Sequence, residues 1–208
     1  MLPLGFKKHA NDIRLIPEAA IVWIGSTLDA FVKTQVDSEE YYEQSRNAVY
    51  AARNIADGKI GEVCVMYYLH EMYGMPLVEI DVESREGSGK GWRPDLIYPN
   101  MNIHVKTSTE EMNARLGCRT WTFQFGNASG VGGRDPMFKH ECHGDYVALV
   151  ELMADRQSYR MVYTAPVSYM IPRMKDPIKH DLVGLKKCIY EPDLDRETRL
   201  SFNISTSF

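Results

Sequence analysis

Residues 91–107 predict a tight β-hairpin whose alternation determines which side chains can meet. Two short strands, over residues 96–98 and 103–107, flank a Pro-Asn turn. Because successive side chains of a strand point to opposite faces, His104 and Lys106 share one face, while the residues that alternate with them are apolar. Asp95 begins the first strand and lies opposite these residues across the hairpin. The pattern therefore gathers a carboxylate, an imidazole and an amine on one side of a sheet.

Further strands are predicted by alternation or by continuous apolar character. The two most apolar runs are typical of strands buried on both faces, and the short polar stretch between them suggests a second hairpin. The predicted strands cover residues 75–82, 120–126, 146–153 and 159–166.

The helices are predicted from apolar stripes and from end signals. A helix over residues 18–32 follows Pro17. A second helical pattern starts at Ser38, is interrupted at Asp57-Gly58, and resumes to residue 73, where Gly74 suits a C-cap. A short helix is expected over residues 110–115. The resumed segment carries a stripe made of Ile60, Val63, Cys64 and Tyr67.

Length and composition indicate one soluble domain with appendages. The chain has 208 residues, 44% of them hydrophobic and 25% charged. We expect an N-terminal helical extension over residues 1–37, a core over residues 38–170, and a C-terminal segment over residues 171–208 that wraps the same domain. No apolar run approaches the ~18 residues of a membrane span. The N-terminus lacks a signal-peptide layout, and the four cysteines are scattered, which favours a cytoplasmic protein with reduced thiols.

The stretch from Pro94-Asp95 through the hairpin to His104-Val105-Lys106 is similar to the core motif of the PD-(D/E)XK nuclease superfamily. A helix carrying Gly61-Glu62 precedes it, and the resemblance covers roughly residues 58–165. The resemblance implies a restriction-endonuclease-like α/β fold, in which helices flank a mixed central sheet. It also implies a metal-dependent endonuclease that hydrolyses the phosphodiester bonds of DNA.

The resemblance assigns a role to each matching position. Glu62 and Asp95 would bind Mg²⁺ or Mn²⁺, which prefer oxygen ligands, and the backbone carbonyl of Val105 would add another ligand. Lys106 would orient or deprotonate the attacking water, or neutralise charge on the phosphate. Gln124 would lie near the metal-bound water.

His104 departs from the family pattern, which has Asp or Glu at this position. Three interpretations follow. His104 ligates a softer ion such as Mn²⁺; or it acts as the base while Glu79, Asp81 or Glu62 supplies the missing charge; or the site is inactive. The last interpretation gives an alternative function, a non-catalytic DNA-binding or assembly protein on the same fold.

The expected partner is DNA, although the formal net charge of −4 counts against extensive phosphate contacts. Basic residues do surround the motif, and a local basic face is compatible with an acidic body. The apolar N-terminal helix suggests a homodimer contact. The run His140-Glu141-Cys142-His143 contains zinc-ligand residue types, but its spacing does not match the usual paired arrangement. The basic residues around the motif are Arg85, Lys90, Arg93, Lys106, Arg115, Arg119, Arg134 and Lys139.

Overall fold

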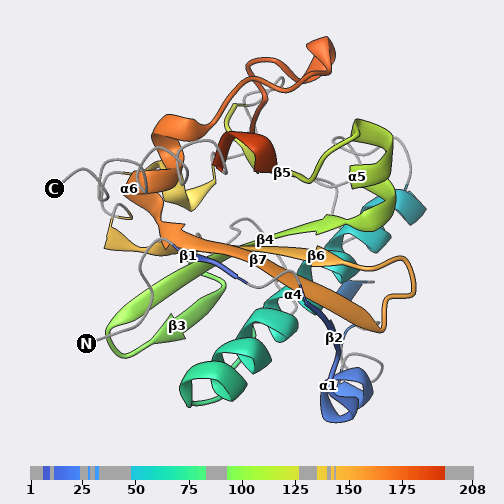
Figure 1. The fold of residues 1–208 in the computed structure, drawn as a ribbon, viewed down its shortest axis with the longest axis vertical. Coiled ribbons are helices and arrows are strands. Elements are labelled where there is room, and N and C mark those ends of the chain that lie inside the picture. Colours follow the sequence, from blue (N-terminus) through green and yellow to red (C-terminus); the bar gives the residue numbers. More distant parts are fainter. Residues whose placement is uncertain are drawn as a thin grey trace, which may run out of the picture.

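The protein is a mixed α/β structure built on two β-sheets (Figure 1). It was obtained as a computed structural model. The residues that it describes are 7–9, 12–23, 28, 31–32, 48–82, 93–126, 135–139, 142 and 144–194.

The main sheet has six strands and mixes parallel with antiparallel neighbours. The predicted hairpin is confirmed as β3 (Leu96–Tyr98) paired antiparallel with β4 (Met101–Thr109). The second hairpin is confirmed as β6 (Tyr146–Leu152) and β7 (Ser158–Pro166), and β4 and β6 run parallel. The strand order is β1-β7-β6-β4-β3, where β1 is Lys7–Lys8, and β2 (Ile13–Leu15) also pairs with β7.

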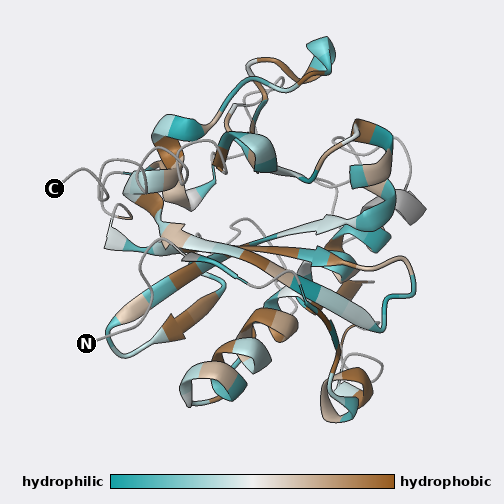
Figure 2. Ribbon diagram, viewed as in Figure 1, coloured by the Kyte–Doolittle hydropathy of each residue, from teal (hydrophilic) through white to brown (hydrophobic). Residues whose placement is uncertain are grey.

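Each face of the main sheet is covered by different elements (Figure 1). The long helix α4 (Ala48–Tyr73) packs on one face. The other face carries the two-stranded sheet of β5 (Thr120–Gln124) and β8 (Lys186–Tyr190), together with α6 (Val167–Met170). Hydrophobic residues recur along α4 and the central strands (Figure 2). Other helical elements are α1 (Glu18–Trp23), α5 (Glu110–Leu116), and the 3-10 turns η2 (Pro136–Phe138), η4 (Ile171–Arg173) and η5 (His180–Leu182), and residues 191–194 are helical as well.

Strand β6 shows how the period of two produces two cores. Val147 and Leu149 lie in the core beside β5 and β8, whereas Ala148 and Val150 lie in the core beneath α4. The strand is buried on both faces, as its continuous apolar sequence predicted. The same alternation in β4 directs Ile103 toward α4.

The predicted interruption of the long helix at Asp57-Gly58 is wrong, because α4 runs through both residues. Asp57 is buried, and Arg156 donates to its two carboxylate oxygens at 2.8 and 3.2 Å. Arg156 therefore satisfies the hydrogen-bonding capacity of Asp57 within the helix, at the residue that had suggested a break. The start predicted at Ser38 lies outside the described residues.

The strand predicted over residues 75–82 is also wrong, since this stretch carries no strand assignment. Met75 and Ile80 are buried in the core beneath α4, so the alternation reflects packing without a hydrogen-bonded ladder. Three further strands were missed. The N-terminal extension adds β1 and β2 to the main sheet besides its helix, and the C-terminal segment contains β8.

Candidate active site

Asp95 lies where β3 and β4 separate. The backbone ladder between these strands ends at the Leu96–Ile103 pair. Beyond it, the N–H of Val105 donates to Asp95 Oδ2 at 2.7 Å, so a carboxylate replaces a missing backbone partner. The N–H and C=O of one residue in a strand point to the same side. The carbonyl of Val105 is therefore directed to the same side as the Asp95 carboxylate.

Glu62 reaches this point because α4 approaches β4 unusually closely. A Cβ atom on Gly61 would lie 1.9 Å from Thr107 Oγ1, which shows that the contact requires glycine. The following residue, Glu62, is thereby buried beside β4, with 6% of its surface exposed. Its Oε2 accepts a hydrogen bond from Lys59 Nζ at 2.9 Å.

Lys106 completes the cluster from the other face of β4. Its Nζ lies 2.5 Å from Asp135 Oδ2 and 5.6 Å from the centre of the Phe123 ring. Asp135 is buried, and its backbone N–H donates to the carbonyl of Gln124 at 2.8 Å, which fixes the carboxylate beside the lysine. The ammonium of Lys106 also interacts electrostatically with Asp95 and Glu62.

The environment of this cluster raises the pKa of both Glu62 and Lys106. Burial, and after it the charge of Asp95, raise the pKa of Glu62 to about 8, against the opposing effects of Lys59 and Lys106. Burial lowers the pKa of Lys106, but the carboxylates of Asp135, Asp95 and Glu62 outweigh it, so this pKa lies above its ordinary value. Lys106 therefore stays cationic at neutral pH. This charge state suits a hydrogen-bond donor to an anion and does not suit a general base.

Glu62 is expected to make stability depend on pH. Its pKa is about 8 in the folded protein and 4.5 in the unfolded chain, so the folded state retains a proton between these values. The contribution of Glu62 to the free energy of unfolding is then fully present below pH 4.5 and is lost as the pH rises to about 8. The slope is at most about 1.4 kcal/mol per pH unit. In Glu62→Gln this slope should flatten, as measured by urea unfolding at a series of pH values in the presence of EDTA.

Glu71→Gln is the matched control for this experiment, because Glu71 lies on the same helix and pairs with Arg14 at a partly exposed site. The control should keep the wild-type slope. An unchanged slope in Glu62→Gln would contradict the raised pKa.

His104 does not lie beside Glu62 and Asp95, as the resemblance implied, but on the opposite face of β4. The His104 ring is 2% exposed, and its Nε2 lies 3.1 Å from Asp145 Oδ2. The electrostatic partners that shift Glu62 are Asp95, Lys59 and Lys106. His104 thus faces the segment that leads into β6.

Gln124 is held by local partners instead of facing the predicted metal-bound water. Its Oε1 accepts from Lys186 Nζ, and its Nε2 donates to the carbonyl of Gly126. Its contribution to the cluster comes from the backbone, through the bond to Asp135. Gln124 differs from the prediction because β5, which carries it, belongs to the two-stranded sheet and not to the main sheet.

Two members of the cluster were missed by sequence reasoning. Lys59 lies three residues before Glu62, and the i,i+3 spacing of a helix is a signal that could have found it. Asp135 ends a glycine-rich stretch and carries no periodic signal. Only the tertiary structure brings it to Lys106.

The residues present fit a hard divalent cation. The buried Glu62 and the partly buried Asp95 repel each other, and strand geometry directs the Val105 carbonyl to the side of Asp95. A cation would relieve this repulsion, and carboxylate and carbonyl oxygens are the ligands that Mg²⁺ and Mn²⁺ prefer. The arrangement thus supplies two acidic ligands, a carbonyl and a neighbouring ammonium.

Comparison with known proteins gave no match to a protein-family model, to a curated protein or to a solved structure. Of the helices that the structure describes, none has the length and apolar character needed to cross a membrane. The functional interpretation therefore depends on the side chains and contacts described above.

Proposed function

We propose that the protein is a divalent-metal-dependent endonuclease that hydrolyses DNA phosphodiester bonds on a restriction-endonuclease-like fold. One observation carries the proposal. Glu62, Asp95 and Lys106, from a helix and two adjacent strands, form one electrostatic cluster where β3 and β4 separate. The mixed sheet with helices on both faces supports it further, since the resemblance of residues 58–165 implies that arrangement.

The roles follow from the chemistry of the cluster. Glu62, Asp95 and the Val105 carbonyl would hold Mg²⁺ or Mn²⁺. A cation held there would polarise the phosphate and would lower the pKa of an attacking water. Glu62 must release its proton to act as a ligand, so its raised pKa makes cation affinity increase with pH. Lys106, held by Asp135, donates hydrogen bonds to the non-bridging phosphate oxygens and stabilises the charge that develops there.

A second candidate function is DNA binding without cleavage. The observation that favours it is the pairing of His104 with Asp145. Histidine occupies the position of the family's second acidic ligand and is turned toward Asp145, so this position supplies no negative ligand to the cluster, and fewer negative ligands weaken the binding of Mg²⁺.

Incubation with supercoiled plasmid, single-stranded DNA and branched duplex DNA separates the two functions. We expect cleavage of at least one substrate with Mg²⁺ or Mn²⁺ and none with EDTA, read on gels and paired with mobility-shift binding in Ca²⁺. Binding without cleavage under every cation would support the second function. Absence of both binding and cleavage would refute both.

A further inference from the structure

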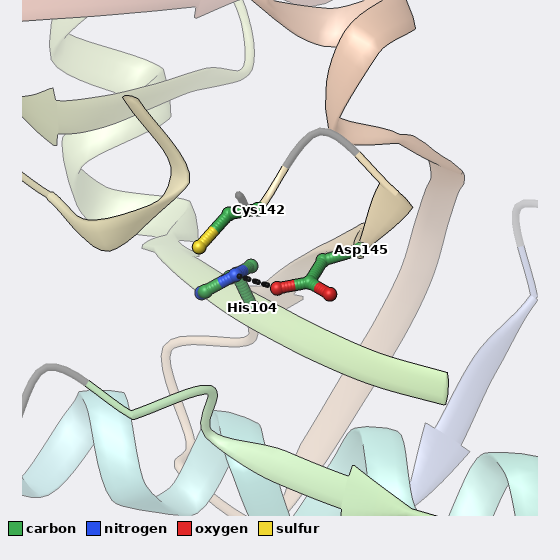
Figure 3. Close-up of side chains that lie close together, drawn as sticks. All are labelled: His104, Cys142 and Asp145. Carbon is green, nitrogen blue, oxygen red and sulfur yellow. Dashed lines mark hydrogen bonds and ion pairs between the residues drawn. The ribbon is translucent and has the colours of Figure 1, made fainter. Parts of the chain in front are cut away.

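Three side chains with metal-ligand chemistry converge on the face of β4 opposite α4 (Figure 3). His104 projects from β4, while Cys142 and Asp145 come from the segment that precedes β6 (Figure 3). Ligand atoms of the three, an imidazole nitrogen, a thiol sulfur and a carboxylate oxygen, all lie within 4.8 Å of one another. His104 and Asp145 are buried, and Cys142 is partly buried.

Backbone bonds hold these ligands in place independently of any ion. The N–H of Asp145 donates to the carbonyl of Cys142 at 2.9 Å, and the N–H of Val167 donates to the carbonyl of Asp145 at 2.8 Å. Asn102 Nδ2 donates to Asp145 Oδ1 at 3.0 Å, which leaves Oδ2 directed at His104. Such outer contacts orient ligand groups in known metal sites.

The distances between these ligand atoms are close to those of a tetrahedral zinc site. With ordinary zinc–ligand bond lengths, ligand atoms lie roughly 3.3–3.7 Å apart. His104 Nε2 and Asp145 Oδ2 are already 3.1 Å apart. Cys142 Sγ lies within 4.8 Å of both. A movement of one ligand atom by about 1 Å would therefore bring all three to the spacing of a zinc site.

We propose that His104, Cys142 and Asp145 bind a zinc-class transition-metal ion at a site distinct from the Glu62–Asp95 cluster. A thiolate and an imidazole select Zn²⁺ and Co²⁺ over Mg²⁺ and Ca²⁺. Three protein ligands leave a fourth position for water or another ligand. The bound ion ties the segment before β6 to β4, two residues along the strand from Lys106. This site also gives a reason for a histidine at the position where the nuclease motif has an acid.

Titration of the reduced, metal-free full chain with Co²⁺ tests this site directly. A thiolate ligand gives a near-ultraviolet charge-transfer band, and tetrahedral coordination gives intense visible bands. We expect both bands to saturate at one Co²⁺ per chain and to be displaced by Zn²⁺. Cys142→Ser should abolish the charge-transfer band, and His104→Gln and Asp145→Asn should each weaken binding by at least about tenfold.

Cys118→Ser is the matched control, because Cys118 is also partly buried and stands outside the cluster. It should keep both bands, and so should Asp95→Asn, which removes a charge from the other cluster. A second readout is thermal unfolding, in which stoichiometric Zn²⁺ should raise the Tm of wild type but not that of folded Cys142→Ser. Absence of a charge-transfer band in wild type, or its survival in Cys142→Ser, would overturn the proposal whether or not the protein cleaves DNA.

Discussion

Lys106→Met is expected to lower metal-dependent DNA cleavage by about 10²–10³-fold, the usual cost of removing a donor that stabilises transition-state charge. The pKa of Lys106 lies above its ordinary value because Asp135, Asp95 and Glu62 surround it, so the wild-type side chain is an ammonium at the pH of the assay. Methionine keeps much of the apolar stem of Lys106 but removes the ammonium that lies 5.6 Å from the centre of the Phe123 ring. Cleavage rates at saturating Mg²⁺ measure the effect.

Asp95→Asn should reduce cleavage at least as strongly, because it removes a negative ligand from the proposed cation site. Asparagine keeps an oxygen that can accept the hydrogen bond from Val105 N–H, so the local backbone should be preserved. A partial recovery of rate at high Mn²⁺ is expected only for this variant, since Lys106→Met leaves the ligands in place.

The chain offers close controls for both changes. Lys187 pairs with Asp176 at 2.7 Å and lies 5.1 Å from the Phe125 ring, which repeats the contacts of Lys106 away from the cluster. Asp155 accepts backbone N–H bonds in the β6–β7 turn, as Asp95 does in its own hairpin. Lys187→Met and Asp155→Asn should cleave at the wild-type rate. Wild-type rates in Lys106→Met and Asp95→Asn would refute the proposed active site.

Local rules predicted the parts of the site that depend on neighbouring residues. The alternation of residues 103–107 sufficed to put Ile103 and Lys106 on opposite faces, and the Pro-Asn turn sufficed to pair β3 with β4. Glu62 and Asp95 were predicted from the resemblance, and the structure brings both into one electrostatic cluster with Lys106. The strand period alone placed Ile103 and Lys106, whereas Glu62 and Asp95 needed the resemblance in addition to the order of segments.

Local rules failed where distant segments decide the outcome. His104 was assigned to the Glu62–Asp95 group, but its Nε2 forms a hydrogen bond with Asp145, which lies 41 residues further along the chain. Asp135 lies 29 residues after Lys106 in the sequence, yet its carboxylate pairs with the Lys106 ammonium. Strand β8 pairs with β5 across more than sixty residues, as the contact between Gln124 and Lys186 shows. No periodic pattern encodes such pairings, because loop closure is set by the packing of the whole core.

Two glycines in helix α4 give the sharpest test of how the site is positioned. Alanine at either glycine gains about 0.8–1.0 kcal/mol of helix propensity. At Gly58 nothing lies within 4 Å of the new Cβ, so Gly58→Ala should raise the free energy of unfolding by that amount. At Gly61 the new Cβ would meet Thr107 Oγ1 at 1.9 Å and Thr107 Cβ at 3.0 Å, and the contact with Thr107 Cβ remains whichever rotamer the threonine adopts.

Gly61→Ala should therefore be less stable than Gly58→Ala by about 1–3 kcal/mol, the range for an overpacked core, as measured by urea unfolding. Thr107→Ala should recover part of the loss in the Gly61→Ala background, which a double-mutant cycle measures as a coupling between the two sites. Because the helix must move away from β4 to fit the methyl group, Glu62 should also separate from Asp95, and cleavage should fall in Gly61→Ala but not in Gly58→Ala. Equal stability and equal activity of the two alanine variants would mean that the close approach of α4 to β4 does not hold Glu62 in the site.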